Sequence, residues 1–498
     1  MNAAFGWRRC LLLCLPAILV GAAIRVAFLT AIPEGFYGAD SPSYFVAAER
    51  IWQEHRISFP ARRRWLYPLL LVPSPALLVS PARSAPVLQH LLGLATLFGI
   101  GWITGCLTKL RNLWIPAVTL IAAILPQMVW DEHELISETV FLALFVLTAA
   151  LAMPPGALKD RKRLFWFLLS AAAVASVKPH GRGIWLGCVV FAVLPAGNPF
   201  KWGGKCWGAL GAAALIILTS GEKQQGDWLL LSSTLPLVKL EGSKWKEYRD
   251  SLRPIVLRAR AEGDQYPWDQ KGYKKPLSDP DPSKIGPVWA GLTTREKEFS
   301  KVCAGLAREA ILDHPFAFAN ITATKIGIAF ANCDILDPKL EPPAFWELQQ
   351  TVNDDRWKNH PSELRLFYGM DQADYEKKVA ERQTRHNPLY LPLKAAASRV
   401  AWMHEYKDAG KYRLAPGWLG VLALLGLLFC FTPARFAATS VLWLPAFLYL
   451  LTVFAIADRK AEYVQPVEWI GLVLAAIALD VVASGFHRWI LTSRSEKS

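Results

Sequence analysis

The stretch EGFYGADSPSYFVAAERIWQEH, residues 34–55, places one carboxylate, Asp40, just before a predicted helix start. Pro42 suits the first position of a helix, and Ser41 suits the cap that precedes it. An aspartate in this place commonly stabilises the positive end of the helix. With Ser41 as the cap, however, Asp40 stands one residue outside the helix and is available as an acid or a base. The stretch alone leaves both interpretations open.

The helix that follows Asp40 is predicted to be amphipathic. Its charged and amide side chains, Glu49, Arg50 and Gln53, lie off the apolar face. Helical spacing gives that face two aromatic residues that favour a membrane interface, so we expect the helix to lie on the outer leaflet. The face consists of Tyr44, Phe45, Ala48, Ile51, Trp52 and His55.

Four further segments combine charged groups with the ends of apolar runs. They contribute Arg62, Arg63, Arg64 and Tyr67; Asp131, Glu132, Glu134 and Glu138; Lys178, His180 and Arg182; and Arg459, Lys460 and Tyr463. The arginines either snorkel onto lipid phosphate or hold a substrate phosphate in bidentate fashion. Each segment alone is typical of a solvated interface. Together they bring carboxylates and cations to one membrane face, as a lipid-phosphate leaving group and a hydroxyl acceptor would require.

The elements that must position these residues are predicted to be membrane helices. The chain has 498 residues, of which 53% are hydrophobic and only 19% charged, and the apolar residues occur in blocks. A span needs roughly 20 mostly apolar residues, and on that basis we expect about ten spans. They are centred on residues 11–29, 86–106, 113–130, 139–153, 164–177, 183–194, 206–219, 417–431, 438–457 and 467–484. The first run contains Arg25 and lacks a clear cleavage site, so we expect a retained span rather than a signal peptide.

The net charge of +14 fits a membrane orientation rather than nucleic-acid binding. With the N-terminus in the cytoplasm, every predicted inner loop is basic, as the positive-inside rule requires. Anionic lipid headgroups, or a phosphorylated lipid substrate, are the expected partners of this charge.

We expect three parts along the chain. Residues 1–220 form an N-terminal transmembrane module with a first outer loop at 31–85, residues 221–415 form a mostly helical extracytoplasmic domain, and residues 416–498 form C-terminal transmembrane helices. In the second part, Cys303 and Cys333 are able to pair if they face an oxidising compartment, although sequence does not give their distance. The cysteines show no metal-binding spacing.

Several motifs, in order along the chain, resemble a known family. GADSPSY and RRWLYPLLL follow the first span, LISETVFLALFVL opens the fourth, VASVKPHG carries a Lys-Pro turn, and AEYVQPVEWIGLVLAA enters the last. With PVLQHLLGLATLFGIGWITG, they are similar to the GT-C class of integral membrane glycosyltransferases, in particular bacterial members related to protein mannosyltransferases and lipid A aminoarabinose transferases. The resemblance covers roughly residues 1–219 and 416–498.

The resemblance implies a GT-C-like helical fold in the bacterial inner membrane, with transfer of a sugar from a polyprenyl-phosphate donor to a glycan, lipid or protein hydroxyl at the periplasmic face. In that chemistry Asp40 and Glu138 would be the catalytic residues, with Asp40 as the general base and Glu138, or Asp131, positioning a sugar or the acceptor. Arg64, Lys178 and Arg459 would neutralise the leaving phosphate. The resemblance places substrate-binding roles on Arg64, Tyr67, Asp131, Lys178, His180, Arg459 and Tyr463.

The chain carries no Gly-rich phosphate loop, so we expect no nucleotide and no other cofactor. Some family members carry adjacent acids where this chain has Asp40 followed by Ser41, which leaves a metal an open question.

Two other functions stay open. A membrane polysaccharide polymerase or ligase would use a large outer loop like the one predicted here, but does not need an acid-headed surface helix after the first span. A transporter would favour paired broken helices near the midplane.

Overall fold

The structure is a computed structural model, and it describes residues 6–31, 35, 41–55, 64–73, 81–154, 156–196, 207, 210–211, 230–231, 233–242, 244–262, 296–331, 371–383, 418–431, 433–456 and 464–495. These residues are almost entirely helical, and no strand occurs among them. Four of their helices are long and apolar enough to cross a membrane: Trp7–Thr30, Ala82–Leu107, Ala438–Ala455 and Pro466–Phe486. This composition agrees with a helical membrane protein.

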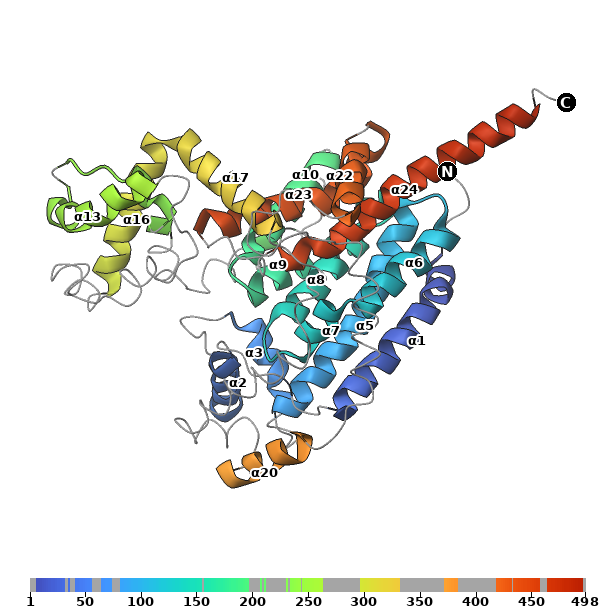
Figure 1. Ribbon diagram of the computed structural model, residues 1–498, viewed down its shortest axis with the longest axis horizontal. Coiled ribbons are helices and arrows are strands. Elements are labelled where there is room, and N and C mark those ends of the chain that lie inside the picture. Colours follow the sequence, from blue (N-terminus) through green and yellow to red (C-terminus); the bar gives the residue numbers. More distant parts are fainter. Residues whose placement is uncertain are drawn as a thin grey trace. The chain divides into compact units, whose positions relative to one another are not determined.

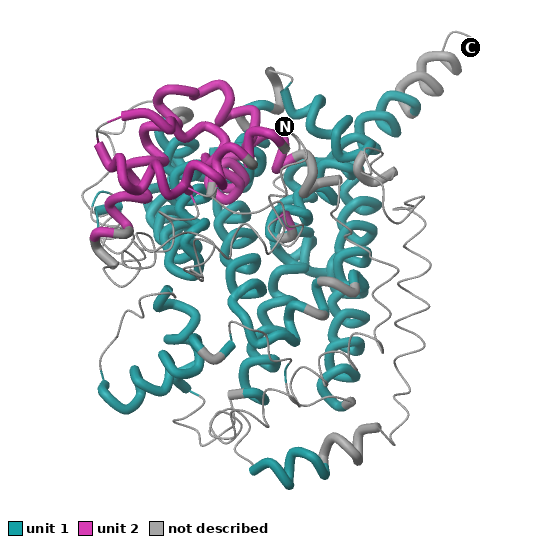
Figure 2. The backbone as a smooth tube through the Cα atoms, turned by 60° about the vertical axis from the view of Figure 1, so that its left-hand side comes forward, with its two compact units in different colours: residues 1–220, 334–446, 465–498 teal, residues 221–333, 447–464 magenta. Residues whose placement is uncertain are grey.

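The chain divides into two compact units, which Figure 2 distinguishes by colour. Unit 1 comprises Met1–Ser220, Asp334–Ala446 and Gln465–Ser498, and unit 2 comprises Gly221–Cys333 and Phe447–Val464. The predicted domain boundaries at residues 220 and 415 stay predictions.

Unit 1 holds most of the described helices (Figure 1). They are α1 (Trp7–Ala31), α2 (Ser41–Glu54), α3 (Leu66–Leu71), α5 (Pro81–Leu107), α6 (Arg111–Ile124), α7 (Pro126–His133), α8 (Glu138–Leu151), η1 (Ala157–Lys159), α9 (Arg161–Val177), α10 (Gly181–Ala196), α20 (Gln372–Gln383), α22 (Trp418–Cys430) and α24 (Gln465–Ser495). Helix α23 (Pro433–Ile456) passes from unit 1 into unit 2 after Ala446.

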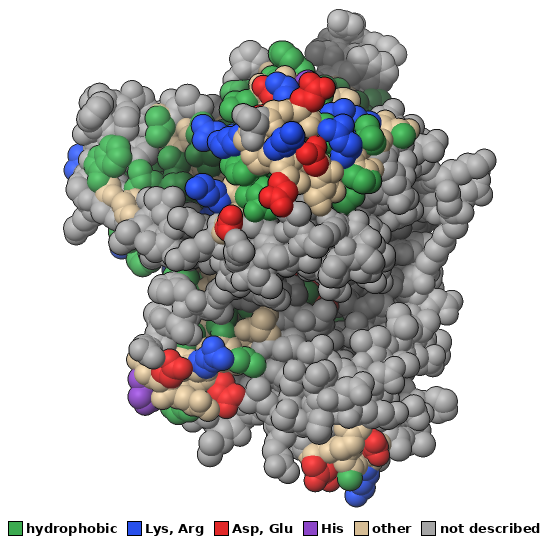
Figure 3. All heavy atoms as spheres, turned by 90° about the vertical axis from the view of Figure 1, so that its left-hand side faces the viewer, with side chains coloured by type: hydrophobic (Ala, Val, Ile, Leu, Met, Phe, Trp, Pro, Cys, Tyr) green, Lys and Arg blue, Asp and Glu red, His purple; other side chains and the backbone are tan. Residues whose placement is uncertain are grey.

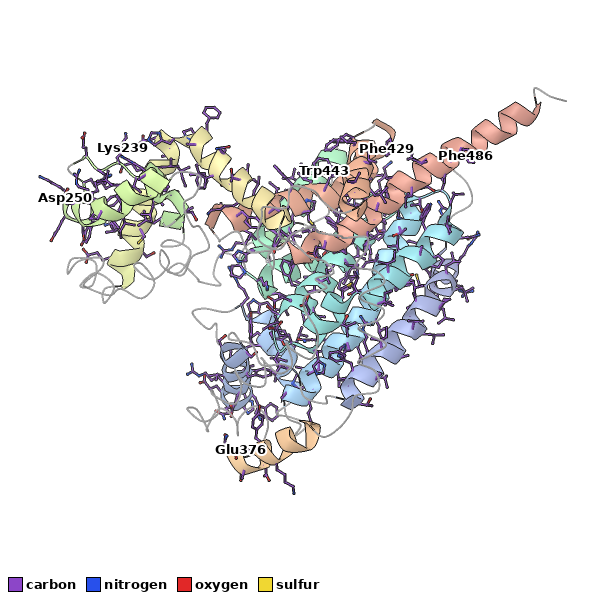
Figure 4. All side chains as sticks on the ribbon, viewed as in Figure 1. Lys239, Asp250, Glu376, Phe429, Trp443 and Phe486 are labelled. Atoms are coloured by element: carbon purple, nitrogen blue, oxygen red, sulfur yellow. The ribbon has the colours of Figure 1, made fainter. Side chains whose placement is uncertain are left out.

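The N-terminal helices of unit 1 pack side by side, including some that are not consecutive along the chain. α1 packs on α5 and α6, α5 packs on α8, and α9 lies between α8 and α10 (Figure 1). A Cβ at Gly101 would come within 2.8 Å of Thr119, so this glycine allows α5 to approach α6 closely. Near the C-terminus, α24 packs on α22. The ring of Trp443 on α23, which Figure 4 labels, lies tilted against those of Phe431 and Phe436, with ring centres 5.3 and 5.2 Å apart.

One predicted span differs from the structure. The apolar run at residues 113–130 forms two helices, α6 and α7, rather than one. Leu125 between them is extended, with ψ of 115°, because it precedes Pro126 and a proline disfavours the helical conformation of the residue before it.

Helix α2 begins at Ser41, one residue earlier than predicted. The predicted apolar face is divided in the structure. Trp52 and His55 are exposed at the end of the helix, whereas the rest of the face is buried within unit 1, where α2 packs on α3. Its buried members are Tyr44, Phe45, Ala48 and Ile51. Tertiary packing therefore takes part of the face that we expected to contact lipid.

Opposite ends of unit 1 are joined by different contacts. At one end, Arg9 of α1 donates a hydrogen bond to Asn112 of α6. At the other end, the backbone N–H of Gly35 donates to the carbonyl of Ala82 at 2.7 Å, and Ser41 of α2 contacts Leu135. The described parts of the first three predicted outer segments therefore meet at one end of the helices, here called the polar end: residues 35, 41–55, 64–73, 81–93, 128–139 and 177–182.

At the end of the helices where Arg9 lies, an acidic residue of α24 accepts hydrogen bonds from the backbone just before α6. Asp480 is fully buried, and its carboxylate accepts hydrogen bonds from the backbone N–H groups of Lys109 and Leu110 at 2.9 and 2.8 Å. These groups begin α6, where a carboxylate is favourable. A Cβ at Gly426 would collide with the carbonyl of Leu474, so α22 also requires a glycine to approach α24.

Unit 2 contains η3 (Leu235–Leu237), α13 (Lys246–Glu262), α16 (Glu296–Asp313) and α17 (Pro315–Ala331). The first three share an apolar core, in which Cys303 is buried; its candidate partner Cys333 lies outside the described residues. Acidic and basic side chains alternate over the described surface (Figure 3), and Lys239 and Asp250 lie on it (Figure 4). Arg249 is buried and donates to Glu309 at 2.6 Å.

Candidate functional site

The start of α2 lies against the acidic segment before α8. Ser41 donates a hydrogen bond to the carbonyl of Leu135 at 2.8 Å, and the hydroxyls of Tyr44 and Ser137 are 2.9 Å apart. Asp40 lies outside the described residues. Its chain neighbour Ser41 is hydrogen-bonded to Leu135, which precedes Glu138 by three residues.

Glu138 and Lys178 form an ion pair. Glu138 is the first residue of α8, where a carboxylate is favourable, and Lys178 follows the last residue of α9. Lys178 also lies 5.9 Å from the ring centre of Phe141. The side chains of Glu138 and Lys178 are partly exposed, at 25% and 17%. The structure therefore joins a predicted catalytic acid directly to a predicted phosphate-binding cation.

More positive charge surrounds the turn between α9 and α10. Removal from water, together with the charges of Lys178, Arg182 and Arg64, lowers the pKa of His180 from its ordinary 6.5 to about 4. The imidazole is therefore neutral at neutral pH. Arg64 is buried, with 2% of its surface exposed. The turn thus combines permanent cations with a neutral hydrogen-bonding ring.

Tyr67 is fully buried on α3. Its ring packs edge-on against Tyr44 at 4.9 Å, and its hydroxyl donates to Oε1 of Gln89 at 2.7 Å. Burial, with smaller contributions from Tyr44, Glu138 and Glu134, raises the pKa of Tyr67 well above 10. The phenol is therefore a neutral donor whose hydrogen is directed to Gln89.

Asp131 and Glu138, predicted to share one function, line the same cleft. Its other lining residues are Gly93, Thr96, Met128, Glu132, Thr139, Leu142 and Pro466. The space between the walls, including the open mouth, is about 350 Å³, but the enclosed part is no larger than about one water molecule. Pro466 belongs to the start of α24, three residues after Tyr463.

A buried network of four ionisable residues lies next to this cleft. Arg25 of α1 donates to both carboxylate oxygens of Glu132, at 2.6 Å from Nε and 2.5 Å from the terminal nitrogen. His90 Nδ1 lies 2.8 Å from Glu132 Oε2, and His90 Nε2 lies 3.1 Å from His133 Nδ1. None of the four is more than 2% exposed. An ionised carboxylate only accepts, so a hydrogen bond between His90 and an ionised Glu132 requires the hydrogen on Nδ1 of His90.

Two small features hold Glu132 in this geometry. Gln89 donates to the carbonyls of Glu132 and Glu134, at 3.0 and 2.6 Å. A Cβ added to Gly93 would overlap the carboxylate of Glu132. The glycine therefore provides the space that the acid occupies.

Sequence reasoning missed most of this network. Arg25 and His90 each interrupt an apolar run, which is a signal because ionisable groups within membrane helices are costly unless paired. That signal marks the residues but not their partners. Glu132 was recognised as one acid of a group, and its pairing with Arg25 depends on how α1, α5 and α7 pack.

The structure thus brings together six of the nine predicted site residues at the polar end: Arg64, Tyr67, Asp131, Glu138, Lys178 and His180. The other three, Asp40, Arg459 and Tyr463, lie outside the described residues. Among the described residues, no group of three or more His, Cys, Asp or Glu side chains is arranged to hold a metal ion.

Comparison of the chain with known protein families, with curated proteins and with solved structures gave no match.

Proposed function

We propose that the protein is a GT-C-type membrane glycosyltransferase that moves a sugar from a polyprenyl-phosphate donor to a hydroxyl acceptor. One observation carries the proposal: Glu138 and Lys178 are paired at the polar end, where the start of α2 is hydrogen-bonded to the segment before Glu138. Acid, cation and the helix headed by Asp40 are the parts that such a transfer needs.

The proposed chemistry divides the roles by charge. Asp40 takes the proton of the acceptor hydroxyl as general base. Lys178 and Arg64, with Arg459, neutralise the phosphate as it leaves, and a guanidinium is able to hold it in bidentate fashion. His180 is neutral and therefore contributes a hydrogen bond rather than a charge. Asp131 and Glu138 face the sugar or the acceptor from the cleft.

The remaining features belong to the same proposal. The chain has about ten spans. Its N-terminus is cytoplasmic, and its polar end faces the periplasm from a bacterial inner membrane. The acceptor is a glycan, a lipid or a protein, and neither nucleotide nor nucleic acid takes part.

The test is sugar transfer in membranes supplied with a polyprenyl-phosphate sugar. Asp40→Asn should abolish transfer at an unchanged protein level, whereas Glu54→Gln, at the exposed end of α2, should leave transfer intact. Transfer by Asp40→Asn at the wild-type rate would overturn the role of Asp40. A wild-type protein that yields no product from any such donor would overturn the enzyme class, and a long repeating product would favour the polymerase or ligase.

A proton-coupled transporter is a second candidate, favoured by one observation. The Arg25–Glu132–His90–His133 network is a hydrogen-bonded chain of ionisable groups buried among apolar helices, as in proton relays. Proton uptake by proteoliposomes would distinguish this function: a transporter requires uptake that Glu132→Gln abolishes, and a glycosyltransferase does not.

A further inference from the structure

The hydroxyl of Thr139 differs from those of the other buried helical threonines. Thr139 is 3% exposed, and its Oγ1 has no hydrogen-bond partner among the described residues. Four other buried threonines of unit 1 donate to the carbonyl four residues earlier, at 2.7–2.9 Å: Thr96, Thr104, Thr119 and Thr148. A buried hydroxyl without a partner is costly, so its retention at Thr139 requires a reason.

The local structure explains why Thr139 lacks the usual partner. It is the second residue of α8, so the residue four positions earlier, Leu135, precedes the helix. The carbonyl of Leu135 instead accepts the hydrogen bond from Ser41. Thr139 lines the cleft, and its hydroxyl is left without a hydrogen-bond partner among the described residues.

A second atom without a partner lies in the neighbouring residue. Oε1 of Glu138 holds Lys178, whereas Oε2 is buried and has no hydrogen-bond partner within the described part of the chain. Glu138 and Thr139 line the same cleft. The pair therefore offers one acceptor that needs a hydrogen and one hydroxyl that is able to donate.

The size and charge of the cleft limit what satisfies both atoms. The enclosed part takes a group no larger than about one water molecule, which is the size of a single hydroxyl. Asp131 and Glu132 also line it, so a phosphate would meet like charges there. A hydroxyl suits the pair because it donates to the carboxylate and accepts from the threonine.

We infer that Thr139 and Oε2 of Glu138 form a subsite for one hydroxyl of a neutral polyhydroxylated group, the sugar of the lipid-linked donor. The inference rests on the proposed function for the identity of the ligand. It adds a specificity-determining residue, Thr139, that reads the sugar and not the phosphate. Sites that hydrogen-bond a hydroxyl discriminate strongly against analogues that lack it.

The test compares two probes on the purified full-length protein in detergent: a polyprenyl phosphate that carries a hexose, and the same polyprenyl phosphate without sugar. Wild-type protein should bind the sugar-bearing lipid more tightly. Thr139→Val keeps the shape of the side chain but removes the hydroxyl, so it should weaken binding of the sugar-bearing lipid by about 5- to 10-fold. The same variant should bind the sugarless lipid with unchanged affinity. Thr139→Ser, which keeps a hydroxyl, should restore binding of the sugar-bearing lipid.

Thr104→Val is the matched control, because Thr104 is buried on α5 and bonds within its own helix. It should change neither affinity. Equal loss of both lipids in Thr139→Val, or no loss of either, would overturn the subsite and leave a bound water as the partner of these atoms. Selective loss in Thr139→Val, combined with no sugar transfer by wild-type protein, would support the subsite while the proposed transferase activity fails.

Discussion

Lys178, which follows the last residue of α9, forms an ion pair with Glu138, which begins α8. The two helices are consecutive and antiparallel, so the start of α8 and the end of α9 both lie at the polar end. The pair joins an acid at the N-terminus of one helix to a cation at the end of the next helix. The acid, Glu138, also lines the cleft.

Lys178→Met should lower sugar transfer by about 100-fold, because it removes a positive charge from the leaving phosphate. Initial rates in isolated membranes measure the effect. Lys162→Met, at the exposed start of α9, is the control and should retain the wild-type rate. An unchanged rate in Lys178→Met would assign the lysine to the structural support of Glu138 alone.

Gly93→Ala should destabilise the protein by about 1–3 kcal/mol, as overpacking does in a filled interior. The added methyl would overlap the carboxylate of Glu132 and disturb its contacts with Arg25 and His90. Thermal unfolding in detergent measures the change. In the control Gly471→Ala, the new methyl meets only Ala423 at 3.9 Å, so stability should stay the same or rise slightly. Equal midpoints for both variants would contradict the close approach at Gly93.

Arg25→Met should cost about 3–5 kcal/mol, because it leaves Glu132 buried without its counter-charge. Arg83→Met on α5 removes an exposed arginine and should cost little. The double variant Arg25→Met/Glu132→Gln should recover part of the loss, since it removes both charges. A double variant less stable than the sum of the single variants would show that the two side chains do not act as a pair.

Stability should fall as the pH decreases from about 6.5 to about 4, because the folded state holds His180 neutral where the unfolded chain takes up a proton. The lowered pKa means that this contribution is fully present above pH 6.5 and lost below pH 4. His180 as a whole residue is only partly buried, so we expect about 1–2 kcal/mol. His180→Gln should flatten unfolding midpoints across this interval. A wild-type dependence that persists in His180→Gln would assign it to other groups.

The sequence predicts much of the polar end because the alternation of apolar runs fixes which segments share a membrane face. That alternation places Glu138 and Lys178 at the same end of the helices, where they form an ion pair. It also places the segment that begins at Ser41 beside the acidic segment before α8. The division of the run at 113–130 was also readable, since Pro126 stands inside it. Hydrophobicity averaged over the run does not reveal such a break, because apolar residues continue past Pro126 to Trp130.

The partners of individual side chains were not predictable in the same way. The phenol of Tyr67 is directed to Gln89 and the hydroxyl of Ser41 to Leu135, and both choices depend on distances between helices. The hydroxyl of Thr139 has no hydrogen-bond partner among the described residues, and this depends in turn on Ser41, which donates to the carbonyl of Leu135. Such effects arise from packing, and a linear pattern carries no information about which of several nearby carbonyls accepts a hydrogen bond.

The carboxylate of Asp480 has a consequence for how the chain is made. It satisfies the backbone N–H groups of Lys109 and Leu110, yet a ribosome adds it some 370 residues later. Until α24 has been made, the backbone just before α6 lacks its permanent acceptor. This earlier part of the chain therefore reaches its final state only after α24 arrives, so that a chain interrupted before residue 480 leaves it unfinished.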